Sequence, residues 1–252
     1  MAARTLEAET LDHLAPDDPA AIRARRDLRR VNRVMGAQGV LERALARVGP
    51  AVGGAGPVRV LELGCGDGLL LLDLARAGRL DWRDVRLTLL DRQPLIGAAT
   101  LAGYAAAGWQ ARALIADVLD WARGPDPDAP WNVIVANLFL HHFEGDELAA
   151  LFAACARRTG ALVACEPRRS AFALAASHLV GLIGANAVTR RDAVLSVRAG
   201  FKGGELSAAW SAEPADAWRL EEYDDGLFSH SFCAVRREPA SNRRVLLPEP
   251  TP

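Results

Sequence analysis

Lysine and tyrosine are almost absent from this chain of 252 residues, which contains one lysine, Lys202, and two tyrosines. Neither tyrosine stands at Tyr-x-x-x-Lys spacing, so the chain lacks an acid–base pair that many NAD-dependent oxidoreductases use to move a proton. That class of enzyme remains an alternative, and it would require binding of NADH. The other basic residues are all arginines or histidines.

Cysteine is scarce and scattered. The four thiols form no CxxC pair and have no histidine nearby at the spacing of metal ligands; they are Cys65, Cys155, Cys165 and Cys233. This pattern predicts reduced, buried thiols rather than a disulfide framework, and it predicts no metal site.

The chain has neither an excess of one charge nor a long apolar run. Its net charge of −1 excludes a global field that would draw in nucleic acid or an anionic membrane. The longest apolar region, residues 171–187, is interrupted by Ser177, His178, Gly181 and Gly184, so we expect no membrane span. The polar N-terminus lacks the apolar stretch of a signal peptide. We therefore expect a cytoplasmic protein without a nucleic-acid partner.

Residues 1–57 predict a helical segment followed by a linker. Apolar positions recur at helical spacing from about residue 20 to 48, and Gly36 and Gly39 are expected to divide this stretch into two helices. The sequence GPAVGGAGP at 49–57 then predicts a linker. The main domain is expected at 58–237, and the proline-containing residues 238–252 predict a flexible tail.

After the linker, short apolar runs alternate with helical patterns. Strands are expected at Val58–Leu63, Val85–Leu90, Arg112–Ala116, Asn132–Ala136 and Ala161–Cys165, and helices at Gly68–Ala77, Leu95–Ala106 and Asp146–Arg158. This alternation predicts an α/β, Rossmann-like doubly wound fold whose mostly parallel sheet is covered on both faces. Trp218–Tyr223 and Ser231–Arg236, joined by a short turn, predict a closing antiparallel hairpin. The expected sheet has seven strands, of which the last is antiparallel.

The most specific motif is VLELGCGDG at residues 60–68, which ends the first strand and opens a helix. The glycines allow a tight turn and a close approach of a ligand to the backbone. Their GxGxG spacing differs from the GxGxxG of dinucleotide binders. Glu62, two places before Gly64, would repel a pyrophosphate but suits a ligand that carries an ammonium and a sulfonium. A purely structural turn is the alternative.

Acidic residues also end the next two strands. Asp91 could accept both hydroxyls of a ribose, and capping of the following helix is the alternative role. Asp117 could bond an adenine amino group while the Val118 amide serves a ring nitrogen, but Asp117 could equally cap a helix.

The fourth strand runs directly into Asn137, His141 and His142. Ligands in open α/β sheets bind at the carboxyl ends of the strands, so this segment is expected to line the site.

With these motifs in this order, the chain resembles the class I S-adenosylmethionine-dependent methyltransferases over residues 58–237. More narrowly, it resembles bacterial small-molecule methyltransferases of the ubiquinone/menaquinone type, through the stretches 27–32 and 192–205. The resemblance implies that the glycines surround the methionine part of S-adenosylmethionine and that Glu62 holds its ammonium. The expected cofactor-binding residues are Glu62, Gly64, Cys65, Gly66, Gly68, Asp91, Arg92, Asp117, Val118 and Asn137. Arg29 and Asn32 are expected to close over the cofactor.

Methyl transfer to a phenol benefits from a general base, for which His141 and His142 are the candidates. Adjacent residues on a helix point about 100° apart, so at most one is expected to face the acceptor. Packing, or capping of the next helix, is the alternative role for both. Among the other histidines, His230 is a weaker candidate, His178 is expected in the core and His13 on the surface.

The acceptor is expected to be a small phenolic, quinone or polyketide-like molecule, methylated on O or C. Four arginines could meet an acceptor carboxylate or carbonyl, although a solvated basic face is the alternative; they are Arg168, Arg169, Arg190 and Arg191. The sequence Asn137-Leu138-Phe139-Leu140 replaces the Asn/Asp-Pro-Pro-Tyr/Phe tetrapeptide, which argues against DNA adenine methylation. A catalytically silent cofactor-binding partner subunit is a further alternative. The oligomeric state stays open, with a homodimer among the options.

Overall fold

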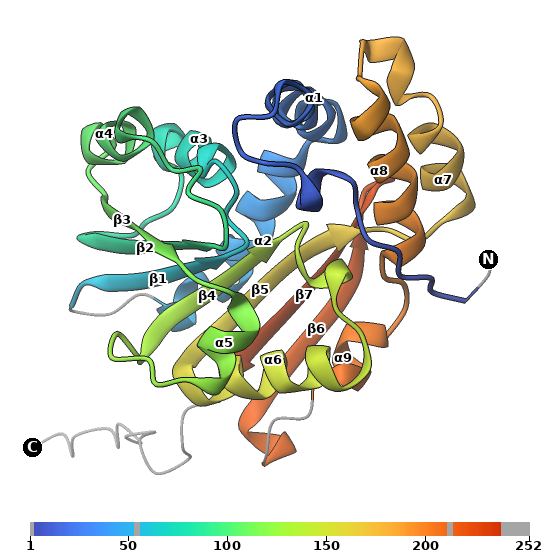
Figure 1. Cartoon of the computed structure of the whole chain (residues 1–252). Helices are drawn as coiled ribbons and strands as arrows, with labels where there is room; N and C mark the ends of the chain where they lie inside the picture. Colours follow the sequence, from blue (N-terminus) through green and yellow to red (C-terminus); the bar gives the residue numbers. More distant parts are fainter. Residues whose placement is uncertain (1–2, 53–55, 211–213, 238–252) are drawn as a thin grey trace, which may run out of the picture.

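The computed structural model describes residues 3–52, 56–210 and 214–237, which form a seven-stranded sheet with helices on both faces (Figure 1). The strand order is β3-β2-β1-β4-β5-β7-β6. β7 pairs antiparallel with β5 and β6, whereas the other neighbouring strands are parallel. The expected Rossmann-like fold is confirmed. The reversed strand is the last in the chain, but it lies inside the sheet rather than at its edge.

All seven expected strands are present, with ends shifted by a few residues. Their bounds are β1 Val58–Leu63, β2 Val85–Asp91, β3 Gln110–Ile115, β4 Trp131–Asn137, β5 Thr159–Pro167, β6 Trp218–Asp225 and β7 Ser229–Arg236. Along β1, side chains alternate between two cores: Val58 and Val60 pack on one face of the sheet, while Leu61 and Leu63 pack on the other. A central strand with two buried faces is therefore almost continuously apolar.

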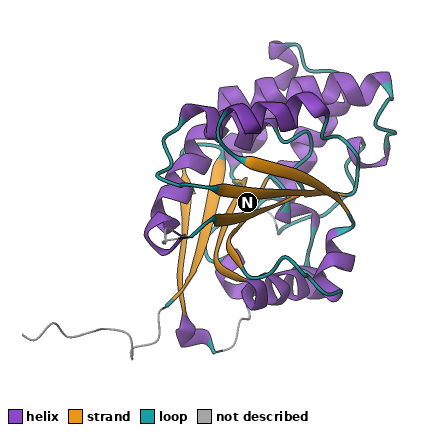
Figure 2. Cartoon of the chain, turned by 90° about the vertical axis from the view of Figure 1, so that its left-hand side faces the viewer, coloured by secondary structure: helices purple, strands orange, loops and turns teal. Residues whose placement is uncertain are grey.

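Helices cover both faces of the sheet (Figure 2). One core contains residues of α2 Ala37–Val52, α3 Leu69–Ala77 and α4 Ala98–Ala106. The opposite core contains residues of α5 Val118–Arg123, α6 Gly145–Arg158 and α9 Glu205–Ala209. The short helices α5 and α9 lie outside the ranges that the periodicity predicted.

The N-terminal helices divide at one glycine, not at two. α1 Pro19–Met35 ends at Gly36, which adopts a left-handed conformation with φ 69° that favours glycine. The expected division into two helices is confirmed, but Gly39 lies inside α2 and takes no part in it. α2 also continues through residues 49–52, where a linker was expected. The rest of that linker overlaps residues 53–55, and the expected tail at 238–252 likewise lies outside the described residues.

A cap of helices covers the carboxyl ends of the strands. It consists of α1, α7 Ala171–Ser177, the 3₁₀ helix η3 Val180–Ile183 and α8 Ala187–Ala199. The Asn186 side chain donates to the Ala20 carbonyl, and the Asn186 amide donates to the Asp27 carboxylate. These bonds fasten α1 to the start of α8. Within the described residues, no helix is both long and apolar enough to cross a bilayer.

Candidate functional site

A cavity of about 530 Å³ lies between the strand ends and the helical cap. Its floor comes from the loops after β1, β2 and β4, and its roof comes from α1, α7, η3 and α8. The short N-terminal segment around the 3₁₀ helix η1 Leu11–His13 closes one side. Segments far apart in the sequence therefore line one cavity at the carboxyl edge of the sheet, as expected for this type of fold.

The glycine loop after β1 adopts the conformation that its sequence predicts. Gly64, Gly66 and Gly68 all have positive φ, at 63°, 55° and 68°. A Cβ on Gly64 would lie 2.0 Å from the Phe139 ring, whereas a Cβ on Gly66 would meet no atom within 4 Å. Gly64 and Gly66 line the cavity; Gly68 starts α3 behind it, against Ile96. The backbone at Gly66 thus faces open space.

Asp91 ties the end of β2 to this loop. Its Oδ2 accepts the Gly66 amide at 2.8 Å, and its Oδ1 accepts the Gln93 amide at 2.9 Å. Arg92 also reaches the cavity and donates to the Asp12 carbonyl at 2.5 Å. Asp91 lines the cavity, and each of its carboxylate oxygens can accept a second hydrogen bond.

Glu62 is a buried acid on the cavity wall, with 4% of its surface exposed, and its Oε2 has no hydrogen-bond partner. Burial, and then the nearby charges of Asp67 and Asp91, raise the pKa of Glu62 to about 8. Three carboxyl groups thus lie around one cavity, and the charges of Asp67 and Asp91 oppose ionisation of Glu62. A cationic ligand would relieve both the repulsion and the missing hydrogen bond.

Two further buried polar atoms without a partner belong to cavity residues, namely Asn32 Oδ1 and Thr189 Oγ1. Among the described residues, buried side-chain atoms of this kind occur in five residues, and three of these line the cavity. Buried polar groups in folded proteins are nearly always hydrogen-bonded. Their concentration here indicates a space shaped for a polar ligand. Arg29 also lines the wall, 3.9 Å from the Asp67 carboxylate.

Other expected cofactor residues lie in different places. Cys65 and Asn137 line the cavity. All four cysteines are free and buried, as expected, and burial raises the pKa of the Cys65 thiol. Asp117 and Val118 are not on the cavity wall: Asp117 caps α5 by accepting the Leu119 amide at 2.8 Å. The capping role that the sequence left open for Asp117 is thus present.

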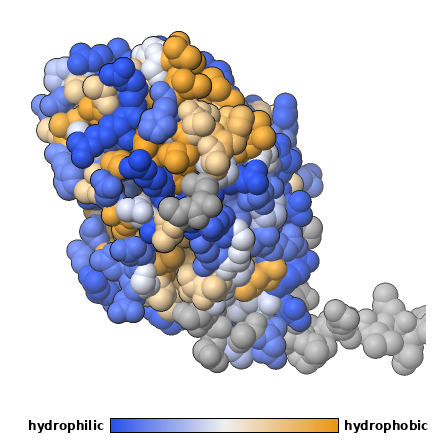
Figure 3. Space-filling view, turned by 90° about the vertical axis from the view of Figure 1, so that its right-hand side faces the viewer, coloured by the Kyte–Doolittle hydropathy of each residue, from blue (hydrophilic) through white to orange (hydrophobic). Residues whose placement is uncertain are grey.

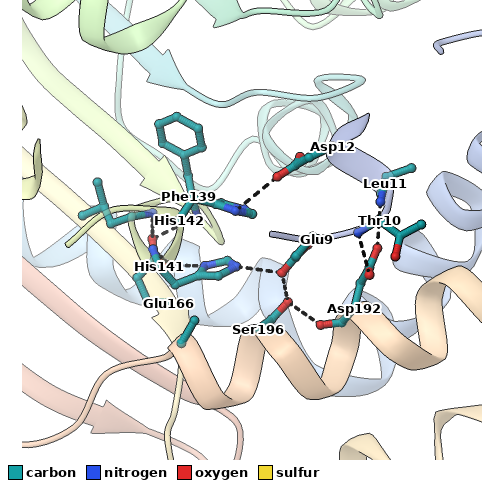
Figure 4. A network of polar contacts seen from close by, with 12 residues as sticks. Glu9, Thr10, Leu11, Asp12, Phe139, His141, His142, Glu166, Asp192 and Ser196 are labelled. Carbon is teal, nitrogen blue, oxygen red and sulfur yellow. Dashed lines mark hydrogen bonds and ion pairs between the residues drawn. The ribbon is translucent and has the colours of Figure 1, made fainter. Parts of the chain in front are cut away.

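His141 is held between two acids (Figure 4). Its Nδ1 lies 2.8 Å from Glu166 Oε2, and its Nε2 lies 3.4 Å from Glu9 Oε1. Burial disfavours the charged imidazole, but the bonds to Glu166 and Glu9 outweigh it and raise the pKa of His141 to about 9. His141 is consequently a protonated imidazolium at neutral pH.

Glu166 organises the turn that carries both histidines. Its carboxylate accepts the backbone amides of Phe139, Leu140 and His141 at 3.1, 2.8 and 3.3 Å. On the other side, Glu9 accepts the Ser196 hydroxyl, and the Asp192 carboxylate accepts the amides of residues 10 and 11 at 2.9 Å (Figure 4). This network fastens the N-terminal segment to α8 and to the end of β4.

His142 lies beside His141, with ring centroids 4.3 Å apart, and it lines the cavity. Its Nδ1 lies 3.4 Å from Asp12 Oδ2. Burial and then the positive charge of His141 lower the pKa of His142. Of the two histidines, His142 is therefore the neutral one and can accept a proton at neutral pH.

Glu9, His141 and His142 also offer ligand atoms within 4.8 Å of one another, a spacing at which a metal ion could be held. In this structure Nε2 of His141 faces Glu9, so the two side chains interact with each other.

The remaining sequence candidates lie off the cavity wall. His230 is buried between Glu222 and Asp224, at 2.8 Å from each, and His13 is exposed as expected. His178 is exposed, so its expected place in the core is wrong: the apolar stretch breaks after α7 and leaves it on the surface. None of the four candidate arginines lines the cavity; Arg168 pairs with Asp224, Arg169 with Glu205, and Arg190 and Arg191 are exposed.

Sequence reasoning missed Glu9, Asp12 and Glu166. Glu166 stands near the end of β5, so the strand-end rule that selected Asp91 could also have selected it. No local pattern marks Glu9 or Asp12, which lie in a segment with almost no regular structure.

Comparisons with known proteins give a matching family model and similar folds. Residues 60–160 match the family model described as a methyltransferase domain. Among solved structures, the plantazolicin methyltransferase BpumL in complex with SAH aligns with a TM-score of 0.60 at 11% identity, over 88% of this chain and 92% of that chain. None of the curated proteins matches.

Two other structures align less closely. Magnesium protoporphyrin IX methyltransferase (ChlM) from Synechocystis PCC 6803, with bound SAH, gives a TM-score of 0.50 at 16% identity, over 90% of this chain and 91% of that chain. A structure titled "Conversion of a Disulfide Bond into a Thioacetal Group during Echinomycin Biosynthesis" gives 0.51 at 20% identity, over 78% and 81%. At these identities the likeness concerns the fold.

Proposed function

We propose that this protein transfers a methyl group from S-adenosylmethionine to an O or C atom of a small molecule, because residues 60–160 match the family model of a methyltransferase domain. The observation that supports this most is Glu62, a buried carboxylate with an unpartnered oxygen beside the open backbone of Gly66. A ligand with an ammonium and a sulfonium supplies the missing positive charge.

The cofactor would occupy the end of the cavity at β1 and β2. Glu62 would bind its ammonium, the amides of the glycine loop its carboxylate, and Asp91 its ribose hydroxyls. When bound, S-adenosylmethionine supplies a methyl group on a cationic sulfur, which makes that carbon electrophilic. Asn32 and Arg29 of α1 would cover it from above. The SAH bound in the BpumL and ChlM structures is consistent with this arrangement. Asp117 and Val118 stay predicted adenine contacts.

The acceptor would occupy the end of the cavity beside His142. Since His142 is neutral and faces the cavity, it would take the proton from an acceptor hydroxyl or carbon acid, which is worth about 10²–10⁴ in rate. His141, as an imidazolium clamped by Glu9 and Glu166, would orient this turn rather than accept the proton. Correct placement of nucleophile and methyl group contributes further, up to about 7–11 kcal/mol.

The acceptor class rests on the sequence resemblance and on the apolar lining of the cavity. A phenolic, quinone or polyketide-like molecule fits a cavity whose lining surface is mostly apolar. BpumL and ChlM are named as methyltransferases of plantazolicin and of magnesium protoporphyrin IX, which are likewise small molecules. The ubiquinone/menaquinone type and a cytoplasmic location stay predictions.

Isothermal titration with S-adenosylhomocysteine tests whether the protein binds the proposed cofactor. We expect micromolar binding, a loss of affinity in Glu62→Gln, and no change in Glu147→Gln, whose carboxylate is exposed on α6. Binding of NADH, without binding of S-adenosylhomocysteine or S-adenosylmethionine, would favour an oxidoreductase. Cofactor binding without transfer of labelled methyl to phenolic, quinone or polyketide acceptors would favour a silent partner subunit.

A further inference from the structure

Exposed apolar side chains gather on one part of the surface. Of the nine large apolar side chains that are exposed among the described residues, seven lie in α1, in the α7–η3 segment or in the turn between β6 and β7. We call these seven the apolar cap: Ile22, Val34, Phe172, Leu179, Leu182, Ile183 and Leu227. Figure 3 shows such side chains grouped in the upper part of the face over α7 and α8. Large patches of this kind on a protein surface mark an interaction site.

The centre of the apolar cap is a segment without charge. Residues 170–189 contain no Asp, Glu, Lys or Arg. Instead of burying this stretch, the fold breaks it into α7, η3 and the start of α8 and leaves Leu182 83% and Leu179 57% exposed. The segment is too short and too broken to span a bilayer, but it presents apolar side chains outward.

A strongly basic helix borders the apolar cap. α1 contains six arginines and one acid, Asp27, which is buried. Within the described residues, the ion pairs of α1 involve Arg29 and Arg30, so Arg23, Arg26 and Arg33 have none. Arg30 also donates to the Gly184 carbonyl at 3.2 Å, which places the basic helix directly against the uncharged segment. The net charge of −1 for the whole chain conceals this local segregation.

We propose that the apolar cap and the arginines of α1 seat this protein on the surface of an anionic phospholipid bilayer. Exposed apolar side chains next to arginines are the combination by which interfacial helices bind membranes, the former entering the headgroup region and the latter meeting the anionic headgroups. A second copy of the chain fits the apolar cap less well. A two-fold dimer would bring the arginine-rich surfaces of both copies together, and their like charges would repel.

The cavity opens within the same surface. Val34, Leu179, Leu182 and Ile183 are exposed and also line the cavity. On a bilayer, this opening faces the lipid, so an apolar molecule dissolved in the membrane reaches the cavity without crossing water. The docking itself requires only the surface and is independent of the reaction in the cavity.

Flotation of the full chain with vesicles tests the docking. We expect binding to vesicles of phosphatidylcholine mixed with phosphatidylglycerol, little binding to phosphatidylcholine alone, and a marked weakening in high salt. Leu182→Glu should weaken binding about 10-fold or more. The double variant Arg23→Glu/Arg26→Glu should weaken it to a similar degree. All of these side chains are exposed, so the fold is not at risk, and thermal unfolding verifies this.

Ile115→Glu is the matched control, since Ile115 is 61% exposed on β3 and lies outside the apolar cap. It should bind vesicles like the wild type. Equal binding by Leu182→Glu and Ile115→Glu, or no preference for anionic vesicles, would contradict docking on lipid. So would light scattering that shows a dimer which Leu182→Glu dissociates, because the apolar cap would then be the contact with a second copy.

Discussion

Phe139 occupies the space that a side chain on Gly64 would need: a Cβ there would lie 2.0 Å from its Cδ2 atom. The glycine loop after β1 and the segment after β4 therefore interlock, and the absence of a side chain at residue 64 is a packing requirement. The same contact lets the turn with the two histidines approach the proposed cofactor end of the cavity.

Gly64→Ala should consequently destabilise the fold by about 2–5 kcal/mol, the sum of left-handed strain of about 1–2 kcal/mol and overpacking of about 1–3 kcal/mol. Urea unfolding measures this loss. Gly78→Ala is the control, because Gly78 has a similar φ of 62° but no atom within 4 Å of its Cβ position. Gly78→Ala should lose only about 1–2 kcal/mol of stability, which comes from left-handed strain, and should bind the cofactor normally. Equal losses in both variants would contradict the interlock.

The buried carboxyl of Glu62 predicts that cofactor binding releases a proton. With its pKa raised to about 8, the empty protein carries this group mostly protonated at pH 7, whereas a bound ammonium favours the carboxylate. Titrations in two buffers of different ionisation enthalpy should reveal release of close to one proton. Glu62→Gln should abolish the release and weaken binding by about 10-fold or more, since hydrogen bonds to charged groups contribute about 1.5–3 kcal/mol.

Glu62 also predicts how stability depends on pH. The folded state holds this proton more tightly than the unfolded chain does, so its contribution is present at low pH and is lost as pH rises from about 4.5 to about 8. Urea unfolding of the empty wild type should therefore lose stability over this range relative to Glu62→Gln. A parallel pH dependence of the two proteins would exclude a raised pKa for Glu62.

The two histidines should respond differently to substitution. His141→Gln leaves Glu9 and Glu166 without their counter-charge, so we expect a loss of about 3–5 kcal/mol in stability. The stabilisation from the raised pKa of His141 is complete below pH 6.5 and disappears as pH rises through about 9. The difference in unfolding free energy between wild type and His141→Gln should narrow over that interval.

His142→Gln should keep stability and cofactor affinity but lower kcat by about 10²–10⁴. Because the pKa of His142 is lowered, the wild-type rate should reach half of its plateau below pH 6.5. Single-turnover methyl transfer measured across pH tests both statements. Full activity in His142→Gln would show that His142 is not the general base.

Asn32→Leu should raise the free energy of unfolding of the ligand-free protein and lower its affinity for the cofactor. Its Oδ1 is buried without a partner, so its removal should stabilise the fold by about 1–2 kcal/mol, while a ligand loses a contact. Tyr223→Phe removes another buried unpartnered oxygen, outside the cavity. This control should gain stability without any change in cofactor affinity. If both variants lost a similar amount of cofactor affinity, Asn32 would not be a cofactor-binding residue.

The sequence alone determined the elements whose signals are local. β1 and the glycine turn follow from a short apolar run and from positive-φ positions that favour glycine, so both could be predicted to the residue. The capping role of Asp117 was visible but could not be separated from adenine binding, because both roles need a carboxylate at a strand end. Gly36 and Gly39 were equivalent break signals in the sequence, but only Gly36 ends a helix, and Gly39 lies within α2.

The tertiary structure decided which of two adjacent histidines is charged. That depends on Glu9 and Glu166, which come from different parts of the chain, and the segment after Glu9 is fastened by Asp192, 182 residues beyond Thr10. Local periodicity carries no information about such pairings. The apolar cap is a second example. The sequence showed an uncharged stretch, but its exposure could not be read from the sequence. In the folded protein this stretch forms short helices beside the basic helix α1, and its apolar side chains are exposed at the mouth of the cavity.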